Sequence, residues 1–126
     1  MASNTVISSS YNAGNIVGTY AGGISGTTLQ GFGNAINSFN VGLVNTTTHQ
    51  GGLDGGPLIP TLTESYWDTT LSGQTYCVAT ETCSNHYTTN TPEYYYSASN
   101  APLSSFSSTY WQFNNNAYPT LKNMPN

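Results

Sequence analysis

The segment Ser10-Tyr11-Asn12-Ala13-Gly14-Asn15-Ile16 recurs, with similar residues, as Ser38-Phe39-Asn40-Val41-Gly42-Leu43-Val44. Each copy precedes a glycine-rich segment, Gly22-Gly23-Ile24-Ser25-Gly26 in the first and Gly51-Gly52-Leu53-Asp54-Gly55 in the second. The offset is 28 residues between the aromatic halves and 29 between the glycine-rich halves, so one residue is inserted between them. A period in the twenties is typical of stacked coils that bury their apolar faces against one another.

The repeat is the basis for predicting how the 126-residue chain is organised. We expect a single domain over residues 1–126, with repeat units at about 6–31 and 36–55. A third, partial unit at 65–74 opens with Ser65-Tyr66-Trp67-Asp68, which follows the second copy by 27 residues. Apolar residues alternate in pieces of three to five, which favours short strands. Poor helix formers dominate the composition, so the predicted fold class is all-β.

Glycines occupy equivalent positions in the two units, and we interpret them as structural. A coil with several corners needs positive φ at some of them, and glycine, or sometimes asparagine, adopts this conformation at low cost. Gly22-Gly23 and Gly51-Gly52 are predicted to be the most constrained pairs. The full set of repeat glycines is Gly14, Gly22, Gly23, Gly26, Gly42, Gly51, Gly52 and Gly55.

Charge is almost absent, since charged residues make up only 5% of the chain and Lys122 is the one basic residue. Binding of nucleic acid or of an anionic membrane surface requires clustered Lys and Arg, so neither partner is expected. No apolar run approaches the 18 residues of a membrane span, so membrane insertion is not expected either. The start of the chain lacks a signal-peptide pattern, so we expect any secretion signal to have been removed or to lie outside this sequence.

The two cysteines, Cys77 and Cys83, are close in sequence, and the chain has no other thiol. This spacing predicts a disulfide that closes a small loop at about 76–84, and hence an oxidising compartment. The alternative is a metal site in which His86 joins both thiolates. The disulfide is favoured because no fourth ligand is evident, and no metal or cofactor site is predicted.

The C-terminal part departs from the repeat. Thr91 and Pro92 suit the N-cap and first position of a single helical turn before Tyr94-Tyr95-Tyr96. Residues 101–126 are rich in large rings and are expected to form an aromatic cap over the last coil, as the ends of stacked folds require. The rings in this segment are Phe106, Tyr110, Trp111, Phe113 and Tyr118.

Each repeat unit consists of the motif Ser-aromatic-Asn-x-Gly followed by the motif Gly-Gly-x-x-Gly. This pattern resembles the GLUG repeat of bacterial surface proteins such as filamentous-haemagglutinin-like adhesins. Ser65-Tyr66-Trp67-Asp68-Thr69 with Ser72-Gly73-Gln74 looks like the segment that commonly follows the last such repeat. Trp111 with Tyr118-Pro119-Thr120-Leu121-Lys122 looks like the usual close of such regions. The resemblance implies a right-handed parallel β-solenoid at the cell exterior. The cysteine loop and the Tyr94–Tyr96 segment are not part of the family pattern, and arrays in that family are often longer than two full repeats.

The acidic residues do not form a recognisable catalytic motif. Asp54 and Asp68 would resemble the carboxylate pair of a glycosidase only if they lay on neighbouring coils. An aspartate at a glycine corner more commonly binds its own backbone, and we favour that structural role. No catalytic residue is therefore assigned.

Three functions remain open at this point. The first is an extracellular, non-catalytic structural or adhesive module of a secreted surface protein, with a glycan or a protein surface as ligand. The second is a filament subunit that joins identical subunits through open β-edges near Val6-Ile7. The third, least favoured, is a polysaccharide-processing β-helix enzyme. Candidate contact residues are Tyr94, Tyr95, Tyr96 and Tyr110, with packing against the last coil as the alternative.

Overall fold

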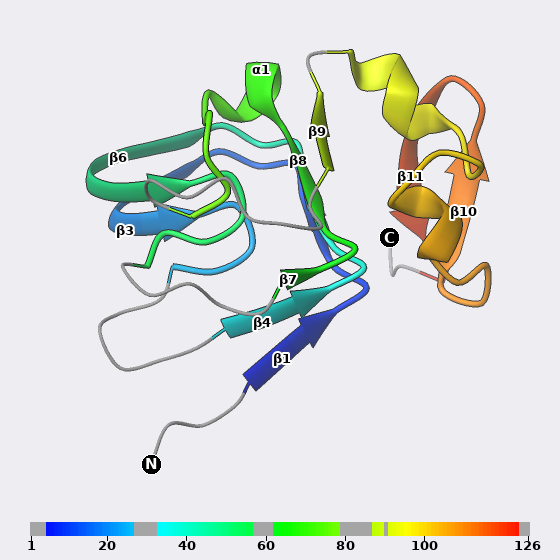
Figure 1. Ribbon diagram of the computed structural model, residues 1–126, viewed down its shortest axis with the longest axis horizontal. Coiled ribbons are helices and arrows are strands. Elements are labelled where there is room, and N and C mark those ends of the chain that lie inside the picture. Colours follow the sequence, from blue (N-terminus) through cyan, green and yellow to red (C-terminus); the bar gives the residue numbers. More distant parts are fainter. Residues whose placement is uncertain (1–4, 27–32, 57–61, 79–86, 90, 124–126) are drawn as a thin grey trace.

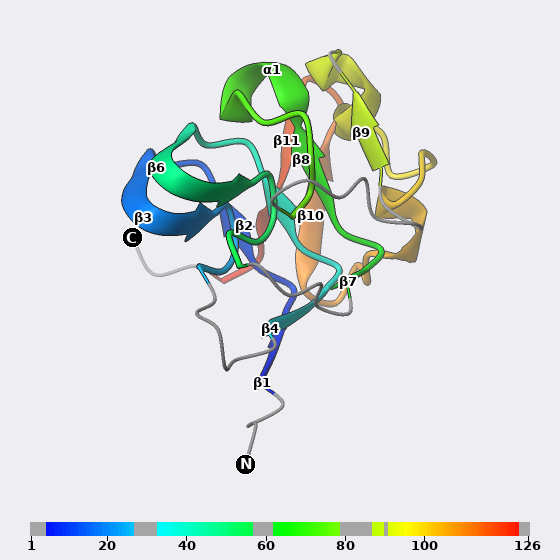
Figure 2. The ribbon, with the colours of Figure 1, turned by 60° about the vertical axis from the view of Figure 1, so that its left-hand side comes forward.

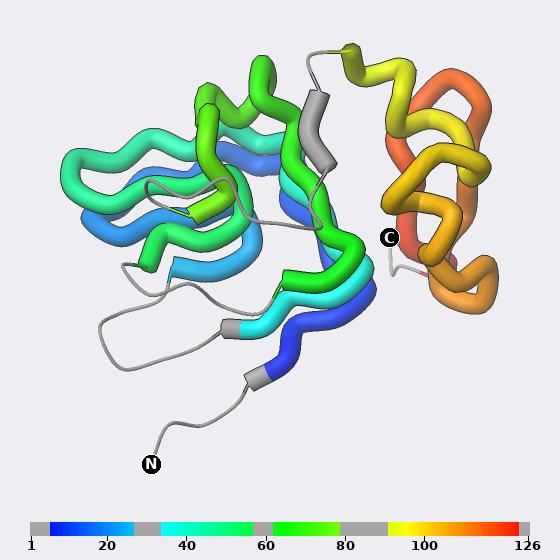
Figure 3. The backbone as a smooth tube through the Cα atoms, in the orientation of Figure 1, coloured from blue at the N-terminus to red at the C-terminus, as the bar shows by residue number. Residues whose placement is uncertain are grey.

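Three passes of the chain lie one above another and form the larger part of the molecule (Figure 3). The computed structural model describes residues 5–26, 33–56, 62–78, 87–89 and 91–123. We call residues 5–26 pass 1, residues 33–56 pass 2 and residues 62–78 pass 3. The chain is mostly strand, and all pairing between the described passes is parallel, which confirms the all-β class.

Each pass contributes strands to sheets that face different sides (Figure 1). The first sheet has the order β1 (Thr5–Ser8), β4 (Gly33–Ile36) and β7 (Leu62–Thr63). The second has the order β2 (Tyr11–Asn12), β5 (Phe39–Asn40), β8 (Tyr66–Asp68) and β9 (Tyr87–Thr89). The third pairs β3 (Ile16–Gly22) with β6 (Val44–Gly51). Single parallel bridges then join Ser25 to Asp54 and Asp54 to Val78.

The sequence offsets predict the register of these sheets correctly. Tyr11 pairs with Phe39, which in turn pairs with Tyr66, and Ile16 pairs with Val44. The register of the third sheet changes between Gly18, opposite Thr46, and Tyr20, opposite His49. The residue inferred from the change in offset is therefore a bulge in β6.

The corner between the first and second sheets is made by a residue in the left-handed region in every pass. Ser9, Asn37 and Glu64 have φ values of 47°, 49° and 46°. This corner carries no glycine, so the prediction that glycine supplies the positive φ of the repeat is wrong. Among the described glycines, Gly73 alone has positive φ, and it ends the short helix α1 (Thr69–Ser72).

Several of the repeat glycines are needed because neighbouring passes approach closely, whereas Gly14 has room for a β-carbon. A β-carbon at Gly42 would lie under 3.0 Å from the carbonyl oxygen of Gly14, and one at Gly51 would meet the backbone of Asp54 and Cys77. The second glycine of each pair faces a side chain inside the coil. Gly23 abuts Asn40 in this way, and Gly52 abuts the ring of Trp67. Space, rather than backbone conformation, therefore explains the conserved spacing of glycine between the two units.

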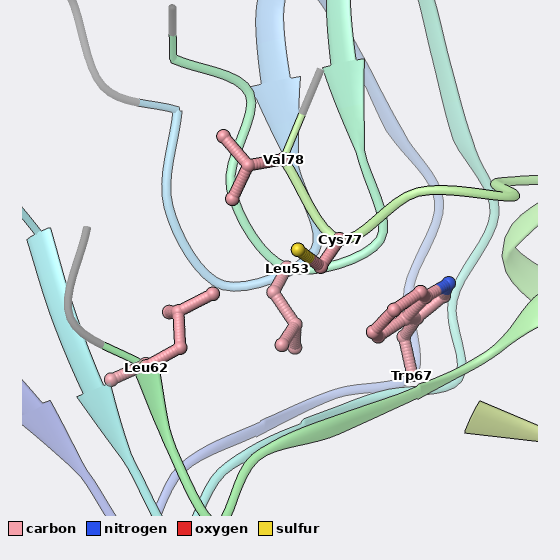
Figure 4. Packing of buried hydrophobic residues seen from close by; sticks show 6 residues of the cluster. Leu53, Leu62, Trp67, Cys77 and Val78 are labelled. Atoms are coloured by element: carbon pink, nitrogen blue, oxygen red, sulfur yellow. The ribbon is translucent and has the colours of Figure 1, made fainter. Parts of the chain in front are cut away.

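The interior of the coil is filled by aliphatic side chains from all sides and by one indole (Figure 4). Leu62 and Trp67 point toward Leu53, Cys77 and Val78 from the opposite wall. All five side chains are buried, together with Ala35 from β4. Burial of one such aliphatic side chain contributes about 1.5–3 kcal/mol, so this small cluster is a major part of the folding free energy.

The second sheet has a further apolar core on its outer face. Strand alternation sends Trp67 inward and its neighbour Tyr66 outward, and Tyr66 lies at 4.9 Å from Phe39, ring centroid to ring centroid. The segments after β9 cover these rings. They comprise the 3-10 helices η1 (Pro92–Tyr96) and η2 (Leu103–Ser105) and the antiparallel strands β10 (Trp111–Asn114) and β11 (Ala117–Leu121).

The aromatic C-terminal segment lies beside the passes rather than over the last one (Figures 1 and 2). Trp111 packs against Tyr11 of pass 1 and Phe39 of pass 2, and Tyr118 also packs against Phe39. The prediction of a cap over the last coil is therefore wrong in its placement. The physical reason is that pass 1 and pass 2 each expose an outward ring on the second sheet, and one aromatic layer buries both.

Two local predictions concern the start of η1 and the cysteines. The helical turn begins at Pro92 with Thr91 as N-cap residue, as predicted, although it is a 3-10 helix. Cys77 is buried and is not a free thiol. Cys83 and His86 lie outside the described residues, so the Cys77–Cys83 pairing stays a prediction.

The repeat offers a matched test of close approach. We expect Gly42→Ala to lower the free energy of unfolding by about 1–3 kcal/mol, because the new methyl group meets the Gly14 carbonyl. The equivalent Gly14→Ala places its methyl no nearer than 3.6 Å to Asn12, so we expect a change within about 0.5 kcal/mol. Chemical denaturation measures both. Equal effects of the two substitutions would contradict the steric explanation.

The left-handed corner gives a stabilising substitution. Glu64 adopts φ of 46°, which asparagine tolerates better than glutamate. We expect Glu64→Asn to raise the free energy of unfolding by about 0.5–1 kcal/mol. Glu93→Asn, which makes the same charge change in η1, is the control and is expected to give no gain. A gain of the same size in the control would show that charge, not backbone conformation, is responsible.

Candidate interaction surfaces

Pass 1 presents the free edges of the stacked sheets. β1 and β2 are the terminal strands of the first and second sheets, and β3 pairs only with β6 among the described strands. No charged residue occurs between residues 5 and 26. Two apolar side chains of this pass are strongly exposed, Val6 by 53% and Val17 by 81%. The edge therefore combines backbone that has no partner strand among the described residues with a neutral, partly apolar surface.

The four tyrosines predicted as contacts fall into two groups. Tyr110 is 59% exposed and Tyr94 is 38% exposed, so both rings are accessible. Tyr95 is fully buried, with its ring 3.8 Å from Tyr66, and so it belongs to the packing alternative. Tyr96 is half-buried and meets Tyr118 edge to face. Only Tyr94 and Tyr110 are thus placed to touch a partner.

A half-buried aromatic pair on the third sheet was missed by the sequence reasoning. Tyr20 and His49 stack with ring centroids 4.8 Å apart, and both side chains are half-buried. The signal was present in the sequence, because the two residues are 29 apart, the offset of the glycine-rich halves. The same two strands also expose polar side chains, among them Thr19, Asn45, Thr47 and Gln50.

Asp68 joins the passes to the C-terminal layer. Its Oδ1 accepts hydrogen bonds from the backbone N–H groups of Thr70 and Leu71, at 2.8 and 2.9 Å, and so caps α1. Its Oδ2 accepts a hydrogen bond of 2.7 Å from the Tyr118 hydroxyl. The carboxylate is fully buried, and its acceptors face donors from two parts of the chain. Asp68 is therefore a structural residue, as its corner position predicts.

Asp54 has a similar structural role on the opposite wall. It is fully buried, accepts a hydrogen bond from the Ser25 hydroxyl, and accepts another from the N–H group of Gly56 at 2.6 Å. Ser25 lies in pass 1, so the carboxylate links two passes. Neither aspartate offers a carboxylate to solvent, which disfavours the glycosidase-like pair considered from the sequence.

Two buried phenols lie in the layer that contains Asp68. Within the described residues, the hydroxyl groups of Tyr66 and Tyr95 have no hydrogen-bond partner, and neither does Nε1 of Trp111. Burial raises the pKa of Tyr66 far above its ordinary value of 10.0, and the nearby Tyr95, Tyr118 and Asp68 add to the shift. Burial likewise raises the pKa of Tyr95, with a further contribution from Asp68. Both phenols are therefore held neutral in the folded protein.

The part of the chain that the structure describes contains no group of three or more His, Cys, Asp and Glu side chains suited to a metal ion. The alternative ligand set of Cys77, Cys83 and His86 includes two residues outside the described ranges. Across those same ranges, no helix is long and apolar enough to cross a bilayer.

Comparison with known proteins gives no assignment: no protein-family model, curated protein sequence or solved structure matches this chain. The function must therefore be inferred from the arrangement of the chain's own residues.

The two buried phenols make stability sensitive to alkaline pH. Both have a raised pKa when folded, so the unfolded chain releases their protons first as the pH rises above about 10. Each of these two protons should lower the free energy of unfolding by about 1.4 kcal/mol per pH unit. Tyr118, whose pKa is raised by burial and by its hydrogen bond to Asp68, adds to the slope. Denaturation at several alkaline pH values measures the slope. The double variant Tyr66→Phe/Tyr95→Phe should reduce it by about 2.7 kcal/mol per pH unit, and an unchanged slope would contradict the assignment.

Proposed function

We propose that this chain is an extracellular, non-catalytic structural and adhesive module in which the three passes form a right-handed parallel β-solenoid. The observation that carries the proposal is the in-register stacking of passes with few charged side chains, in which the buried carboxylates of Asp54 and Asp68 serve the fold. The resemblance of the repeat to the GLUG repeat of bacterial surface adhesins agrees with it. A Cys77–Cys83 disulfide would suit an oxidising exterior.

Support for the structural part comes from how the passes are linked. The described contacts between passes use backbone pairing and side-chain hydrogen bonds, and the bond from the Ser25 hydroxyl to Asp54 is one that involves a carboxylate. Salt therefore has little to screen. The outer aromatic layer then ties Tyr11, Phe39 and Tyr66 together from the side. Such cross-linked stacking gives a stiff unit, which is what a spacer between a cell and a distant ligand requires.

Support for the adhesive part comes from the exposed surface. Tyr94 and Tyr110 offer accessible rings, and the strands that carry the stacked Tyr20–His49 pair also expose hydroxyl and amide groups. Rings surrounded by neutral hydrogen-bonding groups suit the apolar faces and hydroxyl groups of sugars, as well as protein surfaces. We therefore propose a neutral glycan or a protein surface as the ligand.

The proposal is tested by screening the full chain against immobilised glycans and surface proteins. We expect the variant Tyr94→Ala/Tyr110→Ala to weaken the observed binding at least about tenfold, because truncating exposed aromatic anchors commonly costs more than 1 kcal/mol. Tyr76→Ala, which removes a ring exposed by 41% from pass 3, is the control and should bind as the wild type does. Absence of any ligand, or release of new reducing ends from a polysaccharide, would overturn the proposal.

A second candidate is a filament subunit that joins identical chains through open edges. The edge strands β1 and β2 favour this candidate, because they have no described strand beyond them. The other end of the second sheet differs, since α1 follows β8 and η1 follows β9 there (Figure 1). Sedimentation and electron microscopy distinguish the two candidates. Rods at all concentrations would favour the filament, and a monodisperse species of 13.4 kDa would exclude it.

A further inference from the structure

We propose that the free edge of pass 1 is a docking surface for a strand of another protein that carries the same Ser-aromatic-Asn-x-Gly sequence. The strand would bind parallel and in register, as pass 1 itself lies on pass 2. The inference rests on the proposed structural module and names a partner for one of its surfaces. Six features of the edge support it: backbone donors, a serine ladder, an asparagine ladder, an aromatic stack, the absence of protecting charges and the space above Gly14.

The backbone donors follow from the repeat. The N–H groups of Phe39 and Val41 donate to the carbonyl oxygens of Ser10 and Asn12, at 3.0 and 2.9 Å. The N–H group of Tyr66 likewise donates to the carbonyl oxygen of Ser38 at 3.1 Å. Tyr11 and Ala13 hold the same places in pass 1, and no described strand lies beyond β2. Their N–H groups therefore suit two carbonyl groups spaced two residues apart on an added strand.

A serine ladder runs through the corner next to this sheet. The N–H group of Ser10 donates to the hydroxyl oxygen of Ser38 at 3.2 Å, and that of Ser38 donates to Ser65 at 3.3 Å. Each hydroxyl group in turn donates to the carbonyl oxygen two residues earlier in its own pass. The hydroxyl oxygen of Ser10 is the next acceptor in this series, so it suits an N–H group at the serine position of a docked strand.

An asparagine ladder also runs from pass 1 to pass 2, with the donor in the earlier pass. The amide nitrogen of Asn12 donates to Oδ1 of Asn40 at 2.8 Å. Within each pass, the asparagine also bonds the backbone of the glycine two residues later. Asn12 is thus the outermost amide, and its Oδ1 suits the amide nitrogen of one further asparagine.

The ring of Tyr11 identifies the residue between the serine and the asparagine. Tyr11 stacks on Phe39 with centroids 5.3 Å apart and planes 13° apart, and Phe39 stacks on Tyr66 in the same way. An aromatic residue on the docked strand would extend this stack and would be worth about 0.5–1.5 kcal/mol beyond its buried area.

The edge lacks the devices that normally protect a terminal strand. Free edges are usually blunted by lysine, proline or inward charges, since they otherwise pair with other chains. Residues 5–26 contain no charged residue and no proline. Retention of so complementary an edge without protection favours an occupant over a bare surface.

Steric space gives the sharpest contrast between the edge and the interior. A β-carbon at Gly42 would collide with the backbone of Gly14 in the pass above, whereas a β-carbon at Gly14 would meet only Asn12, at 3.6 Å. A docked strand would stand over Gly14 as Gly14 stands over Gly42. Gly14→Ala should therefore block docking while leaving the free protein intact.

A second copy of this chain fits the edge less well. Two identical pass 1 edges that meet about a two-fold axis, with their inner faces aligned, run antiparallel. That direction does not place serine over serine or asparagine over asparagine. The parallel, in-register partner continues all three series, so we assign the edge to a repeat-bearing strand of another protein.

The test uses the full chain and a synthetic peptide with the sequence of residues 8–22, SSSYNAGNIVGTYAG, titrated by calorimetry. We expect the peptide to bind, a scrambled peptide of the same composition not to bind, and Gly14→Ala to weaken binding at least about tenfold. Gly18→Ala is the matched control in the same pass. It should bind within about twofold of the wild type, because Thr46 carries a β-carbon at the equivalent place in pass 2. Thermal unfolding of both variants should match the wild type.

Three outcomes would overturn the inference. They are no binding of the peptide, binding equally weakened in Gly14→Ala and Gly18→Ala, and binding unaffected by Gly14→Ala. A wild-type dimer that Gly14→Ala dissociates, with no peptide binding, would assign the edge to a second copy and overturn the choice of partner. If the peptide does not bind but a glycan or a surface protein does, the docking inference fails and the proposed adhesive function stands. If the peptide binds but no glycan or surface protein does, the adhesive function fails and the docking inference stands.

Discussion

The approach of neighbouring passes to a separation that leaves no room for a β-carbon is the constraint on which this structure depends. Gly42 under Gly14, and Gly51 beside Asp54 and Cys77, permit the backbone contact. Once the passes are this close, equivalent residues stand over one another and short polar side chains reach their own counterparts. The serine and asparagine ladders are consequences of that separation, and they would be lost if the passes moved apart by the width of a methyl group.

The outer aromatic layer depends on the same register. Because Tyr11, Phe39 and Tyr66 occupy one column, their rings form a continuous surface that Trp111, Phe106 and Tyr118 cover together. Asp68 then connects this layer to pass 3 by accepting the Tyr118 hydroxyl group while it caps α1. Inner core, outer layer and buried carboxylate are thus three results of one alignment of strands.

The sequence predicts the register well, because identical spacing in two copies leaves few ways to pair them. The change of offset even locates the bulge in β6. The sequence predicts less well why particular residues occupy the corners and the close contacts. Glycine suggested positive φ, yet the left-handed corner holds Ser9, Asn37 and Glu64, which share no residue type and so gave no signal. The position of the aromatic segment was also beyond sequence reasoning, since ring content indicates burial but not which face is covered. Among the candidate contacts, Tyr95 illustrates the same limit, because adjacent tyrosines in η1 differ only in the direction in which they point.

The left-handed corner has a consequence for how such a chain can change over generations. Its three occupants differ in size, polarity and charge, and the backbone conformation is the same at each. The geometry of the bend is therefore imposed by the passes on either side of it and does not come from the residue at the bend. Side chains at this line of positions are free to diversify, so a family of related coils could vary its outward chemistry along one ridge without altering the scaffold beneath.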